Sequence, residues 1–361
     1  MPRRDRRDWP DWVGYAAAAW SIVYAALGTF WWGGGPGFPF GTENDPAAGI
    51  SILAGASAAV GAPVITVLGL IGALVALGMA RDWGRGPVRA GLLGFGVTAA
   101  VSLTLLIPDY RVLVFTAYAP IVLIGAPFGW PPDASLLDAV TGPLVNQFWC
   151  IGGGVLWAAA SVAYWRRGRG ACPTCGRTDA EPGWIAPDRA ARWGRWATYV
   201  AIAVPVLYAV TRWAWALGIP LGISEEFLRE GQEIGLWLAG AALATLAVVG
   251  AILTLGLVKP WGETFPRWIP FLGARRVPPA LAIIPASIVA ILVTTSGIMF
   301  WRMTLSGGFP LGELELITLE DSWAALAPEL LWPPWGVALG AATLAYHFRR
   351  RGRCSRCGRP R

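Results

Sequence analysis

The sequence predicts an all-α, polytopic helical membrane protein. Of its 361 residues, 55% are hydrophobic and 14% are charged, whereas about 25% of the residues of an average soluble protein are charged. Long runs without a charged residue recur along the chain, and about 20 apolar residues suffice for a helix to cross the hydrocarbon core of a bilayer. The 22 Trp residues suit membrane–water interfaces. The lipid bilayer is therefore the expected partner of most of the surface.

Nine apolar runs are long enough to be considered as spans. Arg and Asp alternate before the first run, and no small-residue cleavage site follows it, which predicts a retained span instead of a signal peptide. The runs are residues 12–32, a segment within 46–80, 90–108, 112–132, 139–165, 196–219, 234–258, 277–301 and 330–348.

The distribution of basic residues selects eight of these runs as crossings. If residues 112–132 do not cross, the segments on the side of the N-terminus hold 25 of the 29 Lys and Arg residues. Basic loops stay in the cytoplasm, so both termini are predicted to lie there, in a protein of the cytoplasmic (inner) membrane. Four prolines favour a re-entrant course for 112–132 on the outer side. The cytoplasmic segments are 1–11, 81–89, 166–195, 259–276 and 349–361.

An internal repeat divides the chain into halves. Residues 155–177 and 337–359 are identical at 12 of 23 positions without a gap. We therefore expect two parallel four-span repeats, related by an axis along the membrane normal. The predicted organisation is a first transmembrane repeat over 1–165, which contains the re-entrant segment, a basic linker over 166–195, a second transmembrane repeat over 196–348 and a basic tail over 349–361.

Each half ends in Cys-x-x-Cys-Gly-Arg, with Cys172 and Cys175 in the linker and Cys354 and Cys357 in the tail. Two such pairs supply the four thiolates of a structural zinc site. One shared zinc ion is the favoured interpretation. Two alternatives stay open. The first is separate or partner-completed sites, and the second is redox or inert thiols, although no thioredoxin-like βαβ pattern surrounds either motif. Cys150 stands alone inside a span and is assigned no chemistry.

Ionisable residues near the predicted outer boundary are candidates for a solute site, because charge at membrane depth is costly. One interpretation is a vestibule for a small solute, surrounded by these residues and the re-entrant segment. The other is an ordinary interfacial rim of ion pairs, in which the basic side chains extend to the interface. The sequence does not choose between them. The candidates are Asp109, Arg111, Arg212, Glu226, Glu230 and Arg302.

Two functional classes follow from these features. The first is a transporter-like or channel-like protein with a cytoplasmic structural zinc knuckle. The second is a membrane-anchored signalling or scaffold protein whose basic zinc module binds a cytoplasmic protein, and anionic lipid headgroups would suit the same basic ends. With one His, no nucleophile elbow and no phosphate loop, an enzyme is the less favoured class. No specific nucleic-acid partner is predicted.

Three sequence features resemble a family of uncharacterised multi-pass membrane proteins from high-GC actinobacteria. They are PDYRVLVFTAYAPIVLIGAPFGWPP at 108–132, WALGIPLGISEEFLREG at 215–231 and the two Cys-x-x-Cys-Gly-Arg endings. No activity is known for that family. The resemblance therefore implies a membrane location and a compact helical architecture, and it assigns no catalytic residue.

Overall fold

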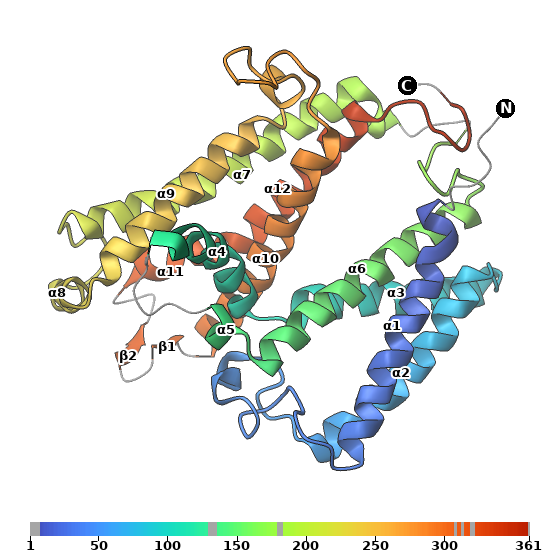
Figure 1. Cartoon of the computed structure of the whole chain (residues 1–361), viewed down its shortest axis with the longest axis horizontal. Helices are drawn as coiled ribbons and strands as arrows, with labels where there is room; N and C mark the ends of the chain where they lie inside the picture. Colours follow the sequence, from blue (N-terminus) through green and yellow to red (C-terminus); the bar gives the residue numbers. More distant parts are fainter. Residues whose placement is uncertain are drawn as a thin grey trace. The chain divides into compact units, whose positions relative to one another are not determined.

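The computed structural model describes residues 8–128, 136–178, 183–306, 309–311, 314–317 and 322–359. Apart from one short hairpin and an isolated antiparallel bridge between Thr264 and Arg276, the secondary structure of these residues is helical (Figure 1). The chain forms two compact units, the first comprising Met1–Ala180 together with Gly352–Arg361 and the second comprising Glu181–Arg351. The C-terminal tail therefore belongs to the first unit, although the chain reaches it only after completing the second.

Eight helical segments among the described residues are long and apolar enough to cross a membrane, which confirms a polytopic helical fold. In the first unit they are α1 (Trp9–Trp32), α2 (Ala58–Ala80), α3 (Gly86–Val101) with the π-helical turn η2 (Ser102–Leu106), α4 (Tyr110–Gly125) with the 3-10 turn η3 (Ala126–Phe128), and α6 (Gly142–Gly168). In the second unit they are α7 (Pro187–Ala216), α9 (Leu236–Leu255) and α10 (Pro279–Leu305).

Shorter elements connect these helices. The first unit adds η1 (Pro46–Ile50) and α5 (Leu136–Ala139). The second adds η4 (Gly183–Ile185), α8 (Glu225–Glu233), η5 (Pro260–Gly262), the antiparallel strands β1 (Phe309–Leu311) and β2 (Leu314–Ile317), α11 (Trp323–Leu330) and α12 (Trp332–Arg350).

Two segments differ from the eight predicted crossings. Tyr110–Phe128, which overlaps the region 112–132 predicted to be re-entrant, is a helical segment of 19 residues that is long and apolar enough to cross a membrane; residues 129–132 lie outside the described residues. α12 covers the predicted last span, but its final turn carries His347, Arg349 and Arg350, and it is not among the eight. The re-entrant course of 112–132 and the crossing by α12 both stay predictions.

Three helix contacts of the first unit have counterparts in the second. In the first unit α1 packs on α2 and on α6, and α3 packs on α6. In the second α7 packs on α9 and on α12, and α10 packs on α12. Small residues permit close contact: a Cβ at Gly69 of α2 would lie 2.8 Å from the Ser21 carbonyl oxygen of α1. The contacts α1–α2, α1–α6 and α3–α6 thus correspond to α7–α9, α7–α12 and α10–α12.

A buried tyrosine lies near the end of α6 in the first unit and near the end of α12 in the second, and each binds a loop of its own unit. The Tyr164 hydroxyl of α6 donates to the carbonyl of Trp83, and the Tyr346 hydroxyl of α12 donates to that of Gly262 at 2.7 Å. Both tyrosine side chains are fully buried. They stand 182 positions apart in the sequence, which is the offset of the matched segments.

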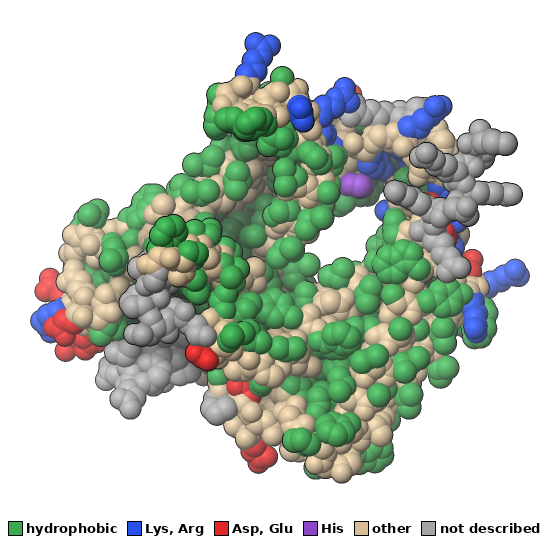
Figure 2. Space-filling view, in the orientation of Figure 1, with side chains coloured by type: hydrophobic (Ala, Val, Ile, Leu, Met, Phe, Trp, Pro, Cys, Tyr) green, Lys and Arg blue, Asp and Glu red, His purple; other side chains and the backbone are tan. Residues whose placement is uncertain are grey.

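Basic residues gather at one end of each unit. In the first unit Arg167 of α6 donates to the carbonyls of Pro10 at 3.3 Å and Met79 at 2.7 Å, so the start of α1 and the end of α2 meet there. In the second Arg350 of α12 donates to the carbonyl of Val277 at 2.7 Å, beside the basic loop 259–276. Hydrophobic side chains cover the flanks of the helices on the face drawn in Figure 2. Each unit thus has helices with apolar flanks and one end that is rich in basic residues.

Candidate metal centre

The first cysteine pair lies in a tight loop shortly after α6. The N–H of Cys172 donates to the carbonyl of Arg177 at 3.0 Å, and the N–H of Gly176 donates back to the carbonyl of Cys172 at 2.7 Å. Gly176 has φ +75°, a conformation that a side chain would strain. The Gly of the motif therefore permits the turn that aims the thiols of Cys172 and Cys175 to one side.

The second pair repeats this geometry after α12. The N–H of Cys354 donates to the carbonyl of Arg359 at 3.3 Å, and the N–H of Gly358 donates to the carbonyl of Cys354 at 2.9 Å. Gly358 has φ +70°. These two backbone bonds of the first loop thus recur 182 positions later, with Cys357 in the place of the second cysteine.

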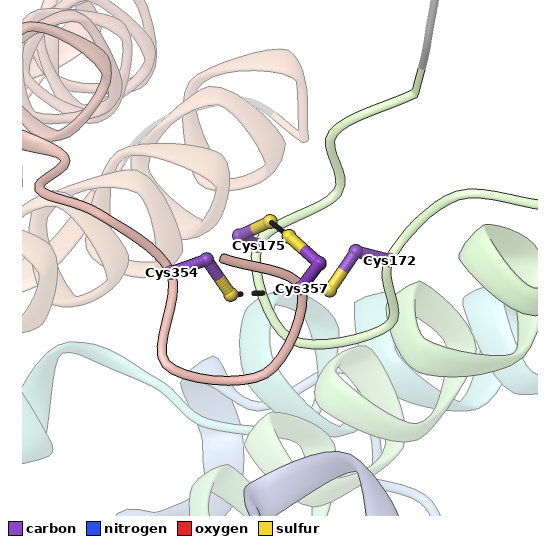
Figure 3. Close-up of side chains that lie close together, drawn as sticks. All are labelled: Cys172, Cys175, Cys354 and Cys357. Atoms are coloured by element: carbon purple, nitrogen blue, oxygen red, sulfur yellow. Dashed lines mark hydrogen bonds between the residues drawn. The ribbon is translucent and has the colours of Figure 1, made fainter. Parts of the chain in front are cut away.

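The four thiols point toward one another from the two loops (Figure 3). All four sulfur atoms lie within 4.8 Å of one another. The Cys172–Cys354 and Cys175–Cys357 sulfur separations are 4.0 and 3.6 Å, against about 3.8 Å between ligands 2.3 Å from a tetrahedrally coordinated zinc ion. The prediction that the pairs come together is confirmed, and the cluster can hold one metal ion.

Two arginines of the motifs bind across the loops. Arg177, which is 5% exposed, donates to the carbonyls of Gly352 at 3.1 Å and Arg359 at 2.9 Å. Arg359 donates in return to the carbonyl of Arg177 at 2.8 Å. These hydrogen bonds hold the two cysteine loops together, and the arginines that form them are not metal ligands.

Both loops are also attached to the start of α1. Arg356 of the tail lies 2.9 Å from a carboxylate oxygen of Asp11 and 3.8 Å from one of Asp8. The Thr174 hydroxyl of the first loop donates to Asp8 at 3.3 Å. The cluster is therefore built into the basic end of the first unit.

The surroundings affect the thiols unequally. Burial opposes ionisation of Cys354, but hydrogen bonds from the backbone N–H groups of Cys357 and Arg356 and from neighbouring thiols outweigh it and lower the pKa of Cys354 to about 7. Burial raises the pKa of Cys175 to about 12. Because a metal ion binds thiolates, its charge would favour the deprotonated form of all four.

The predicted solute residues of the first unit form a buried ionic cluster. Arg111 of α4 contacts Asp109 and Asp45, each with a closest separation of 2.6 Å. Gln147 of α6 donates to Asp109 at 2.8 Å and accepts the backbone N–H of that residue at 3.1 Å. The contact of Asp45 with Arg111 could not be predicted from the sequence, because Asp45 lies in a loop 64 positions before Asp109.

The predicted solute residues of the second unit do not form one cluster in the described contacts. Arg212 of α7 forms an ion pair with Glu329 of α11, which the sequence did not mark. Glu226 and Glu230 are exposed on α8, and Arg302 is half-buried in the last turn of α10. A vestibule that joins these residues to Asp109 and Arg111 of the first unit stays a prediction.

No protein-family model, curated protein or solved structure matches the chain. The actinobacterial resemblance thus stays an expectation from the sequence motifs.

Replacing Arg177 by Ala should weaken metal retention about 10- to 100-fold, as is typical when a partner beyond the metal ligands is lost. The change removes the donor to Gly352 and Arg359 and leaves the four thiols in place. Competition between the purified protein and a chelator, with zinc as the probe, measures the loss.

Arg169→Ala is the matched control, because Arg169 is exposed and its guanidinium lies over the Trp165 ring, 4.9 Å from the ring centroid. It removes the same charge three residues before Cys172. Equal weakening in both variants would show that net charge, and not the contacts of Arg177, stabilises the site.

Proposed function

We propose that the protein is a transporter-like or channel-like protein of the cytoplasmic membrane, in which one structural zinc ion joins the end of the first repeat to the end of the second. The observation that carries the proposal is the four-thiol cluster of Cys172, Cys175, Cys354 and Cys357. The zinc is assigned a structural role, because four thiolates leave no open coordination position for a substrate or water.

Zinc is favoured by the donor set and by the turns. Tetrahedral sites with four cysteines are typical of structural zinc or of iron–sulfur centres, and pairs of Cys-x-x-Cys loops are typical of zinc. The cytoplasm keeps thiols reduced and available as ligands. Sulfur separations of 3.6 and 4.0 Å between the loops favour one shared ion over two separate sites.

A duplicated architecture is supported by equivalences at a constant offset. Tyr164 and Tyr346 differ by 182 positions, as do the cysteines and the arginines of the two loops. Three helix contacts of the first unit also have counterparts in the second. Parallel repeats are common in membrane transporters, so the duplication favours this class.

The cytoplasmic location of the cluster is supported by the basic ends of the units. Arg167 and Arg350 lie at helix ends that meet other basic segments of their own unit. Basic residues are retained on the cytoplasmic side of a membrane. The site and both termini are therefore assigned to the cytoplasm.

The contacts of the knuckle arginines favour transport over a scaffold role. Arg177 and Arg359 donate to carbonyls of the opposite loop, and Arg356 binds carboxylates of α1. A partner surface would present such groups outward. Charged groups are instead buried deep in the second unit, at Arg212 and Glu329, and buried charge in a membrane protein is typical of solute or ion pathways.

Purified protein should contain about one zinc ion per chain, because four ligands complete one site. Cys354→Ser should lose the metal as fully as Cys172→Ser, since each removes one of four ligands. Elemental analysis measures both, with Cys150→Ser as a control that lies outside the cluster. Two zinc ions per chain would indicate separate sites, and a metal-free protein with disulfides would indicate redox chemistry.

Cysteines introduced at Thr178 and Arg275 should resist an impermeant maleimide in intact cells and react after permeabilisation. Both positions lie in basic segments assigned to the cytoplasm. A cysteine at Glu226, exposed on α8, should react from outside. The background carries Cys150→Ser and keeps the four clustered thiols. Reaction of the Thr178 position from outside would overturn the assigned orientation.

Flux through proteoliposomes tests the transport proposal directly. The probes are proton, sodium, potassium, chloride and phosphate gradients. The double variant Arg212→Gln with Glu329→Gln removes both buried charges together, so neither is left unpaired, and it should lose most of the flux seen with the native protein. Arg229→Gln, on the exposed face of α8, should keep it. Absence of any flux with native protein would favour the scaffold function.

A further inference from the structure

Glu329 is a buried carboxylate with only one of its two oxygens bound. It lies in α11 and is 5% exposed. Oε1 accepts a hydrogen bond from Arg212 Nη2, whereas Oε2 finds no hydrogen-bond partner among the residues that the structure describes. A buried charged oxygen without a donor costs free energy. Protonation of Oε2 removes that charge.

Arg212 does not depend on Glu329 alone. Its Nη1 donates to the carbonyl of Ala324 and to the hydroxyl of Thr211, both at 3.2 Å. The carbonyl of Ala324 is available because Pro328, four residues later in α11, has no N–H to donate to it. The guanidinium therefore keeps acceptors when Glu329 is neutral.

Two aromatic rings further stabilise the guanidinium. Its central carbon lies 4.5 Å from the ring centroid of Tyr208 and 4.3 Å from that of Trp215. Both distances are within the range of cation–π attraction. Arg212 thus stays a satisfied cation whether or not its partner carries charge.

Among the described residues of the elements that pack against α11, Arg212 is the charged residue that interacts with Glu329. α11 packs against α7, α10 and α12. On α7 the titratable neighbour is Tyr208, α10 carries Arg302 in its last turn, and α12 has no titratable side chain before Tyr346. The charges of α8, which shares an apolar cluster with α11, are exposed.

We propose that Glu329 is a proton-binding site inside the second unit. A proton from water adds to the unpartnered Oε2 and converts the ion pair into a neutral acid beside a guanidinium that keeps its remaining contacts. On release the proton returns to water and the carboxylate is restored. Burial raises the pKa of Glu329 to about 7 against the attraction of Arg212, which places the exchange near neutral pH. The proposal holds whether or not the protein transports a solute.

Infrared difference spectroscopy of the native, bilayer-reconstituted protein tests the site. The C=O stretch of a protonated glutamic acid, identified by its shift on ¹³C-glutamate labelling, should titrate with a midpoint near 7 instead of the usual value of 4.5. The band should be lost in Glu329→Gln and kept in Glu225→Gln, since Glu225 is exposed on α8. Absence of the band in the native protein, or its persistence in Glu329→Gln, would overturn the proposal.

Thermal stability provides a second readout. The folded-state pKa of Glu329 lies above its ordinary value, so the folded state binds the proton more tightly and stability should fall as pH rises from 4.5 to about 7. Glu329→Gln mimics the neutral acid and should remove this decrease of stability with rising pH, whereas Glu225→Gln should keep it. An unchanged slope in Glu329→Gln would contradict the site. If that variant does not fold, the labelled band of the native protein decides alone.

Discussion

Lipid provides no hydrogen bonds, so each polar group along a membrane helix needs a partner within the protein. The hydroxyls of Ser21, Thr66, Thr198 and Thr294 meet this need locally, since each donates to the carbonyl four residues earlier in its own helix. Longer side chains reach between helices. Arginines that end α6 and α12 donate to carbonyls at the ends of other helices, and in this way the same requirement also determines how the helices are joined.

The sequence predicted the features that depend on local pattern. Apolar runs follow from composition alone, and the knuckle spacing of Cys172 and Cys175 depends on one turn. The partners of single charges were not predictable in this way. Arg212 pairs with Glu329, which is 117 positions later, and no periodicity links the two. Whether residues 110–128 cross the membrane does not follow from local pattern either, because their length and hydropathy allow a span while their prolines favour a re-entrant course.

Outside the matched segments, one pair of residues at the same offset differs in chemistry between the two halves. Gln147 and Glu329 stand 182 positions apart, the same offset as the cysteines. In the first unit the neutral amide of Gln147 both donates to and accepts from Asp109. In the second the acid faces the cation of Arg212. Each residue suits the charge of its partner, since an amide can donate to the carboxylate of Asp109 and a carboxylate can pair with the guanidinium of Arg212.

The return of the tail to the first unit has a consequence for biosynthesis. Cys175 and Cys354 are separated by 179 positions, and at about 5–20 residues per second a ribosome needs about 10–40 s to make that stretch. During that interval the nascent chain holds two thiols of the cluster and lacks the other two. Because α12 ends at Arg350, a chain made only as far as that residue holds all the helices of the described residues and still lacks half of the ligands. The cluster can thus be completed only after α12 has been made.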